Sequence, residues 1–134
     1  MPGRCLVLLL VVAAACGCGS SGRKLESIAV SPATADAQDF PSGEVQFTAT
    51  GTYSSSPSTA PLDSTQVTWC VGSSDGTCAG LVNPGAAVDA SGLAHCNSGF
   101  TGTVTILAGV PGQAGNPDAG VPLAPFGAAQ LTCP

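Results

Sequence analysis

Hydrophobic and polar residues alternate along several short segments that follow residue 25. The clearest is 43–53, GEVQFTATGTY, which places five residues on one side: Val45, Phe47, Ala49, Gly51 and Tyr53. A period of two is typical of a β-strand that buries one face. Alternation, or a short apolar run bounded by turn residues, predicts further strands at 25–32, 66–71, 102–110 and 126–133, and two strands at 86–96 around a turn at 89–92.

Glycine, proline and serine separate these strands. The segment 54–64, SSSPSTAPLDS, is predicted to be a loop, 72–77 a turn built on Asp75-Gly76, and 111–125 a long Gly/Pro-rich loop. No segment shows the apolar spacing of three and four that marks an amphipathic helix. About seven short strands joined by turns predict an all-β domain with the architecture of an antiparallel β-sandwich.

The inward-facing residues of these strands define the expected core. Val67, Trp69 and Val71 fall on one side of 66–71, and Cys70 falls on the other. Trp69 is the only tryptophan, and we expect it to fill the space between two sheets. Its expected neighbours are Phe47, Val45, Val67, Val104, Ile106, Ile28 and Val30.

Five blocks of sequence carry a resemblance to a known family. They are LESIAVSPATA, VQFTATGTYS, STQVTW, VDASGLA and GTVTILAG, and together they cover about residues 25–109. In this order they resemble the bacterial immunoglobulin-like domain of group 2 (BIG2). The resemblance implies an immunoglobulin-like β-sandwich with Trp69 in its core, and a structural or adhesion role at the cell surface. The chain departs from the family in its cysteines after Trp69, in HCNSGF (95–100) and in an extra closing strand, which leaves the strand order open.

The N-terminal segment 1–18, MPGRCLVLLLVVAAACGC, has a different pattern. Arg4 precedes ten unbroken apolar residues, 6–15, whereas a membrane-spanning helix needs about 20. A basic residue, a short apolar run and then small residues are typical of a signal peptide. The small residues before Cys16 or Cys18 resemble the lipobox of bacterial lipoproteins, in which a cysteine thiol is acylated before cleavage.

Either of these two cysteines is a candidate for lipidation. Cys16 directly follows three alanines and is favoured; Cys18 is the alternative, because its choice leaves an even set of four cysteines in the rest of the mature chain. Residues 19–24, GSSGRK, are predicted to be a flexible tether, and 25–134 the folded domain. These features predict a lipoprotein of the bacterial cell envelope, anchored to a membrane by its lipid. A plain secretory signal without lipid is the remaining alternative.

Charge is divided sharply along the chain. All three basic residues lie at or before residue 24, and all eight acidic residues lie after it, so the folded part carries a net charge of −8. Nucleic-acid binding requires clustered Lys and Arg that neutralise phosphates. The charge pattern therefore excludes nucleic acid as a partner. The same lack of basic residues excludes an electrostatic attraction of the domain to anionic lipid.

Four cysteines lie in the predicted domain. Export exposes them to an oxidising compartment, in which disulfides form. Cys70 and Cys78 flank the turn at 72–77, and antiparallel pairing of 126–133 with 102–110 brings Cys133 near Cys96. The predicted disulfides are therefore Cys70–Cys78 and Cys96–Cys133. These spacings lack the paired cysteines of a zinc site, and we expect no metal or other cofactor.

No constellation of residues predicts catalysis, so we expect a protein that is not an enzyme. His95 adjoins Cys96, but neighbouring residues of a strand point to opposite faces, and His95 is expected to be a surface residue. The predicted function is a structural or adhesion module with an unknown protein or polysaccharide partner. The alternative is a ligand- or glycan-binding module that uses the loops 54–64 and 111–125.

Overall fold

A computed structural model of the chain describes residues 22–80, 85–111 and 123–134. The regular secondary structure of these ranges is almost entirely β, and its only helical elements are two 3-10 turns, η1 (Ala37–Asp39) and η2 (Pro41–Gly43). The prediction of an all-β domain is confirmed. The strands are β1 (Leu25–Ser31), β2 (Thr34–Asp36), β3 (Glu44–Gln46), β4 (Thr48–Tyr53), β5 (Thr59–Leu62), β6 (Thr68–Gly72), β7 (Ala86–Val88), β8 (Leu93–Cys96), β9 (Gly102–Gly109) and β10 (Phe126–Cys133).

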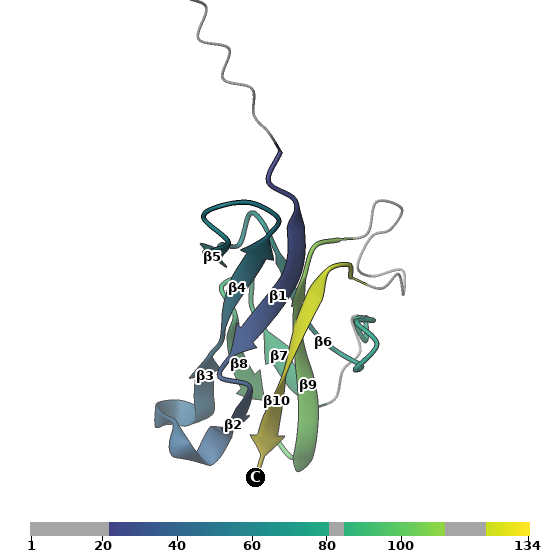
Figure 1. Cartoon of the computed structure of the whole chain (residues 1–134). Coiled ribbons are helices and arrows are strands. Elements are labelled where there is room, and N and C mark those ends of the chain that lie inside the picture. Colours follow the sequence, from purple (N-terminus) through teal and green to yellow (C-terminus); the bar gives the residue numbers. More distant parts are fainter. Residues whose placement is uncertain (1–21, 81–84, 112–122) are drawn as a thin grey trace, which may run out of the picture.

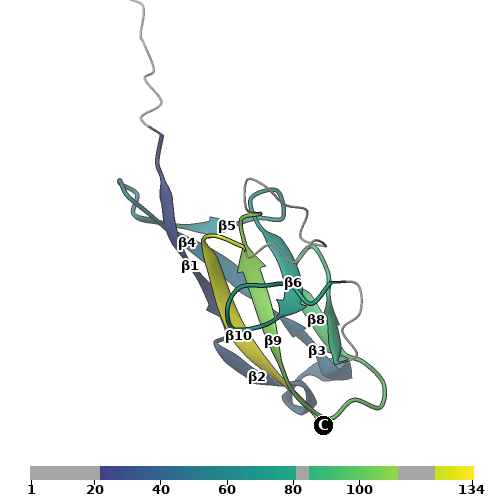
Figure 2. The same cartoon turned by 90° about the vertical axis from the view of Figure 1, so that its right-hand side faces the viewer.

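The strands form two layers that pack face to face (Figures 1 and 2). The first layer contains two three-stranded antiparallel sheets, β1-β4-β5 and β3-β8-β7, and the second layer is the four-stranded sheet β2-β10-β9-β6. β3 and β4 are consecutive pieces of one extended segment, which makes the first layer continuous. Phe47 separates them, and its amide donates to the carbonyl of Gly92 at 2.9 Å. The strand predicted at 43–53 is therefore present but divided at Phe47.

The first strand segment of the domain takes part in both layers. β1 pairs antiparallel with β4; after Pro32 the chain crosses over, and β2 pairs parallel with β10. Proline ends β1 well because it has no amide hydrogen for the ladder. The two layers approach closely where β1 passes β10: a Cβ on Gly127 would lie 2.5 Å from the carbonyl oxygen of Ile28, so only glycine fits.

The main core fills the space between the layers. Phe47, Val67 and Ile106 are buried there as predicted, with Phe47 and Ile106 at 0% exposure. Trp69 requires a correction: it is only half-buried and packs at the edge of the main core. Its indole lies against the turn at Gly92, where a Cβ would be 2.9 Å from the ring. Phe47, which is fully enclosed, is the large side chain at the centre.

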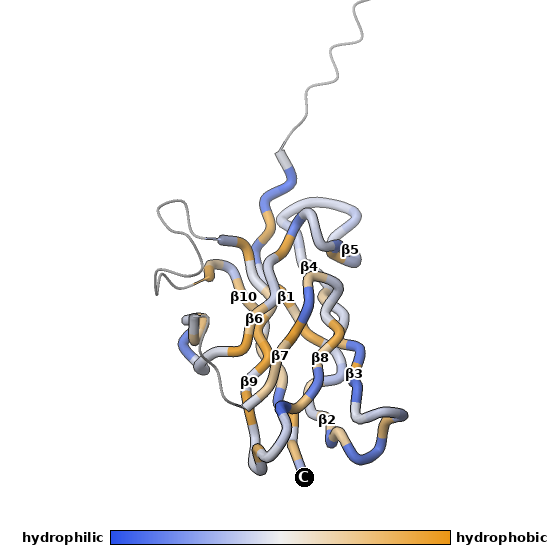
Figure 3. The backbone as a smooth tube through the Cα atoms, turned by 180° about the vertical axis from the view of Figure 1, so that it is seen from behind, coloured by the Kyte–Doolittle hydropathy of each residue, from blue (hydrophilic) through white to orange (hydrophobic). Residues whose placement is uncertain are grey.

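β9 is buried on both of its faces. Val104, Ile106 and Ala108 face the main core, but Leu107 on the opposite face is also fully buried. Leu107 belongs to a second group, called here the outer cluster: Cys70, Cys78, Leu107, Leu123 and Phe126. Figure 3 shows the apolar residues that run through β6 and β9. A strand covered on both sides carries a continuous apolar run instead of alternation.

The segment 54–64, predicted to be a loop, contains a strand. β5 pairs antiparallel with β4, from Thr52↔Thr59 to Ala49↔Leu62. Pro61 sits within β5, which is tolerated because β5 is an edge strand and has no outer neighbour that needs an amide hydrogen. The two prolines of this segment, Pro57 and Pro61, are typical of loops, and they conceal the strand in the sequence.

Candidate functional site

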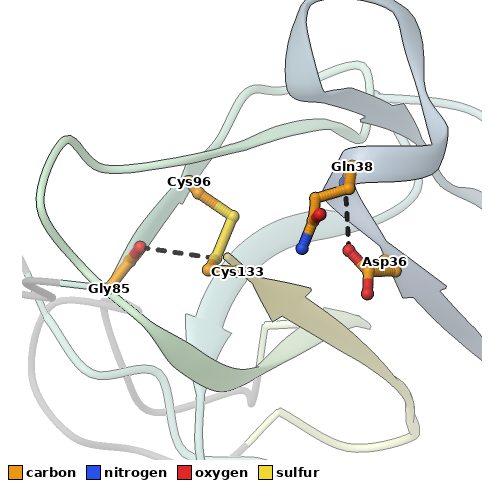
Figure 4. Close-up of a disulfide and its surroundings, with 5 residues drawn as sticks. All are labelled: Asp36, Gln38, Gly85, Cys96 and Cys133. Atoms are coloured by element: carbon orange, nitrogen blue, oxygen red, sulfur yellow. Dashed lines mark hydrogen bonds between the residues drawn. A yellow bond between two sulfur atoms is a disulfide. The ribbon is translucent and has the colours of Figure 1, made fainter.

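The four cysteines of the domain form two disulfides in the predicted pairing. Cys96–Cys133 joins the end of β8 in the first layer to the end of β10 in the second, with Cα atoms 5.7 Å apart. Figure 4 shows this bond beside η1 and Gly85, whose carbonyl oxygen lies 3.9 Å from the sulfur of Cys133. The bond therefore fixes the two layers to each other at one end of the sandwich.

Cys70–Cys78 has a local role. It links β6 to the residue after the turn 73–77, and a single β-bridge pairs Gly72 with Cys78. The amide of Ala79 also donates to the carbonyl of Val71 at 2.8 Å. The turn therefore lies along the outer edge of β6 and contributes Cys78 to the outer cluster.

The chain enters the domain at one end of the sandwich, called here the entry end. The guanidinium of Arg23 lies 4.1 Å from the ring centre of Tyr53 and donates to the carbonyl of Pro57 at 2.6 Å. Ser54 and Lys24 exchange two hydrogen bonds, of 2.9 and 3.2 Å. Arg23 and Lys24, predicted to belong to the flexible tether, are thus held against the domain.

The first of the two loops expected to bind a ligand is placed by these contacts. Residues 54–58 lie directly beside the entering chain, and 59–62 are strand β5. Residues 112–122 of the second loop lie outside the described residues. The use of these two loops for ligand binding therefore stays a prediction.

The opposite end of the sandwich, called here the distal end, carries two candidate sites. Figure 1 shows η1, η2 and the end of β10 gathered there, away from the entering chain. A cleft of about 430 Å³ opens between the 3-10 turns, the start of β3 and the end of β8. We call it the distal cleft; its chemically distinctive lining residues are Gln38, Phe40, Ser42, Glu44, His95 and Cys96.

Local sequence explains the shape of the distal cleft. Asp36 caps η1 by accepting a hydrogen bond from the amide of Gln38 at 3.0 Å, and Pro41 begins η2. Ser42 and Gly43 then reverse the chain with φ angles of +61° and +69°. The turn leaves the ring of Phe40 half-buried, and Figure 4 shows Gln38 on the side that faces the Cys96–Cys133 disulfide.

The two walls of the distal cleft are tied by strand pairing. Glu44 and His95 are direct partners in the antiparallel ladder between β3 and β8, and both side chains are exposed. His95 is thus a surface residue, as predicted, but it lines a cleft. Nothing in the sequence connects residues 38–44 with 95–96, because their proximity depends on the long-range pairing of β3 with β8.

A second cleft of about 450 Å³ shares Phe40 with the distal cleft. Its polar lining includes Asp36, Asp39 and Thr132. Phe40 therefore forms a shared wall between two clefts, both of which carry carboxylates. Among residues 22–80, 85–111 and 123–134, no three potential metal-ligating side chains come together.

Three other carboxylates shape turns. A hydrogen bond from the Ser91 hydroxyl, and then one from the Leu93 amide, lowers the pKa of Asp89 in the turn between β7 and β8. Hydrogen bonds from Thr77 lower the pKa of Asp75, and those from Thr65 lower the pKa of Asp63. Each carboxylate is occupied by its own turn, so these groups serve local structure.

Comparisons with known proteins give no family assignment. No family model matches the chain, and no curated protein matches it. The resemblance to group 2 bacterial immunoglobulin-like domains and to lipoprotein signal peptides remains a prediction from the sequence. In the part of the chain that the structure describes, no helix has the length and hydrophobicity needed to cross a membrane.

Proposed function

We propose that this protein is a non-enzymatic, lipid-anchored module of the bacterial cell envelope with a structural or adhesion role. The observation that carries the proposal is that all four cysteines of the domain are paired. Stable disulfides are typical of proteins outside the reducing cytosol. The other three cysteines all lie in the segment 1–18, where the sequence predicts a signal peptide with a lipobox.

The strand order supports an immunoglobulin-like type of sandwich. In such domains strands A, B, E and D form one sheet and C, F and G the other. With β1 as A and the segment β3–β4 as B, the first layer has the order A-B-E-D, in which β8 is E and β7 is D. The second layer has β10, β9 and β6 in the order G-F-C. The parallel pairing of β2 with β10 and the small strand β5 are additions to this scheme.

Cysteine pairing also bears on which residue carries the lipid. Cys16 remains favoured, because it follows the apolar run directly. If Cys16 carries the lipid, Cys18 has no partner among the cysteines of the domain, because all four are used. If Cys18 carries it, Cys16 leaves with the signal peptide and no thiol is left over. The parity argument thus keeps Cys18 as the alternative.

An anchored protein of this kind has a defined orientation. Residues 17–22 span at most about 20 Å when fully extended, and Arg23 and Lys24 are already held by the domain. The entry end therefore stays near the membrane, and the distal end faces away from it. Any partner in the surrounding envelope meets the distal end first.

Mass spectrometry of the protein purified from membranes tests the proposal. We expect a mature N-terminus at Cys16 that carries acyl chains, together with two intact disulfides. Cys16→Ser should abolish the acylation and leave the precursor unprocessed, whereas the matched variant Cys18→Ser should be processed normally. The opposite behaviour of the two variants would assign the lipid to Cys18. An unacylated protein with reduced cysteines, recovered from the cytosol, would overturn the proposal.

A separate experiment tests the adhesion role. The full-length protein, purified in detergent, is incubated with isolated envelope protein and polysaccharide fractions, with a heat-unfolded sample as the control. Specific retention by one fraction supports an interaction role. Equal retention of the folded and unfolded samples would contradict it.

A further inference from the structure

We propose that the distal cleft binds a neutral glycan of one or two sugar units. The inference deepens the proposed function by assigning a ligand class to the end that faces outward, and only that orientation rests on the proposed function. The cleft volume of about 430 Å³ falls in the range of about 300–1,000 Å³ that small-molecule sites occupy. The cleft also differs from the two loops from which the sequence predicted ligand binding.

An aromatic ring forms one wall of the cleft. Phe40 is half-buried and packs against the main core on one side, so its ring is held in place. Phe40 lines both the distal cleft and the second cleft. A sugar ring presents C–H groups on one face, and such a face packs well on a fixed aromatic ring. Phe40 is thus the apolar platform of the site.

Polar side chains around this ring supply both donors and acceptors. The Gln38 amide, the Ser42 hydroxyl and the His95 imidazole each donate and accept, and the Glu44 carboxylate accepts. None of these four side chains makes a hydrogen bond within residues 22–80, 85–111 and 123–134. They are therefore available to a ligand. Sugar hydroxyls both donate and accept, so they use the whole set, whereas a cation uses only the acceptors.

Charge narrows the ligand class further. Glu44 lines the distal cleft, Asp36 and Asp39 line its neighbour, and the sequence has no lysine or arginine after residue 24. A phosphate, sulfate or uronate would meet carboxylates and neither lysine nor arginine. Acidic sugars are therefore disfavoured, and neutral ones are preferred.

The backbone of the cleft is also unusual. Ser42 is the one non-glycine residue with positive φ in the described ranges, at +61°. Residues other than glycine rarely adopt a positive φ, and such backbone conformations are concentrated at functional sites. At this position the turn places Ser42 in the lining of the distal cleft, together with Phe40.

Titration of the full-length protein in detergent with defined sugars tests the proposal. The probes are maltose, cellobiose and N,N′-diacetylchitobiose as neutral disaccharides, digalacturonate as the acidic counterpart, and glucosamine as a cationic sugar. Binding is followed by calorimetry and by backbone amide shifts. We expect at least one neutral disaccharide to bind at millimolar concentration or below, with shifts confined to residues 37–44 and 95–96. Digalacturonate and glucosamine should bind more weakly.

Variants identify the residues responsible. Phe40→Ala should weaken binding about tenfold through loss of the stacking face, and Phe40→Trp should retain it. Glu44→Gln preserves shape at an exposed position and should weaken binding about fivefold, because it replaces a charged acceptor by a neutral one. Tyr53→Ala, which removes an aromatic ring at the entry end, is the matched control and should leave binding unchanged. If Phe40→Ala does not fold, Phe40→Trp and Glu44→Gln carry the test.

Three results would overturn the inference. They are the absence of binding by all three neutral disaccharides, equal or stronger binding of digalacturonate or glucosamine, and binding that is unaffected by Phe40→Ala and Glu44→Gln. None of them depends on the N-terminal lipid, because the titration reads the folded domain directly. Conversely, an unlipidated protein that still bound a neutral sugar would contradict the proposed anchor and leave this site in place.

Discussion

The second layer of the sandwich is covered on both faces, and the two covers are built differently. On its inner face, the main core packs it against the whole first layer, and Cys96–Cys133 joins the layers at the distal end. On its outer face, the small outer cluster covers β9, and Cys70–Cys78 fastens the turn that contributes to it. Each cover thus has one disulfide, but only the inner one connects distant parts of the fold.

The difference assigns separate tasks to the two covers. The inner disulfide links residues 37 positions apart and the outer one residues 8 positions apart. The main core holds the two layers together, so its loss is a loss of the fold. The segment that carries Cys78 covers the edge of β6, because the amide of Ala79 donates a hydrogen bond to the carbonyl of Val71. The outer cluster covers the outer face of β9. An unsealed edge strand is a site for pairing with other chains.

The largest expected effect is at the centre of the main core. Phe47 is 0% exposed, and Phe47→Ala should lower the free energy of unfolding by about 3–5 kcal/mol, because it opens a cavity between the layers. Urea denaturation followed by circular dichroism measures this change. Thr48→Ala, at the adjacent exposed position, is the matched control, and a loss as large as that of Phe47→Ala would show that the main core is placed wrongly.

The inner disulfide should rank next. The double substitution Cys96→Ser, Cys133→Ser, which leaves no lone thiol, should lower the free energy of unfolding by about 3.9 kcal/mol in the chain-entropy model. The expected loss is large because this disulfide closes a long loop and joins the two layers. Urea denaturation under oxidising conditions gives the value. A smaller loss than for the outer disulfide would invert the comparison between the two covers.

A single substitution in the outer cluster should cost less than Phe47→Ala. Leu107 is also 0% exposed, but Leu107→Ala should lower the free energy of unfolding by about 3 kcal/mol. Leucine is smaller than phenylalanine and the outer cluster is smaller than the main core, so the substitution removes fewer packing contacts. Ile106→Ala, the neighbour that faces the main core, is the matched comparison in the same denaturation assay. Equal or greater loss at Leu107 would make the outer cluster an equal partner in the fold.

The outer disulfide should have the smaller effect of the two bonds. The double substitution Cys70→Ser, Cys78→Ser should lower the free energy of unfolding by about 2.6 kcal/mol, because the bond closes a short loop. It should also uncover the edge of β6. Light scattering at rising concentration should therefore show more self-association than in the Cys96→Ser, Cys133→Ser protein, when both are compared at conditions where they remain folded.

The sequence predicts the parts of this fold that depend on local pattern. The strand at 102–110, the hairpin around 89–92 and the closing strand at 126–133 follow from alternation and turn residues. The Cys96–Cys133 disulfide follows from how 102–110 pairs with 126–133, and Cys70–Cys78 follows from the turn at 72–77. β5 was missed because Pro57 and Pro61 are typical of loops, and only its position at an edge makes Pro61 acceptable. The burial of Trp69 was overestimated, because tryptophan is a residue type that favours the core. In the structure this side chain is only half-buried, at the edge of the main core and against the turn at Gly92.

The candidate site was much harder to predict than the fold. The distal cleft brings together residues 38–44 and 95–96, which are adjacent only because β3 pairs with β8. The segment Asp39–Gly43, DFPSG, does contain a signal: an aromatic residue followed by strong turn formers. That signal predicts an exposed turn with a ring on it, but not which strand end will face the ring.

The smallest expected effect concerns the turns of the two covers and depends on pH. Hydrogen bonds from Ser91 and Leu93 lower the pKa of Asp89, in the turn that packs on the main core, and those from Thr77 lower the pKa of Asp75, in the turn of the outer cluster. A carboxyl whose pKa is lower in the folded state adds stability above its unfolded pKa of about 3.9, and this stability is lost as the pH falls through the folded value. Asp89→Asn and Asp75→Asn should therefore each lower the stability slightly at pH 7, where a charged acceptor is replaced by a neutral one, and change it little at acidic pH, so that the acid side of the stability curve becomes flatter. Asp39→Asn, at a carboxylate that caps no turn, is the control, and the readout is the urea midpoint between neutral and acidic pH. Similar flattening by both turn variants would mean that the two covers differ in packing and in the length of the loop that each disulfide closes, but not in the electrostatics of their turns. Flattening by neither variant would show that the hydrogen bonds to these carboxylates do not form.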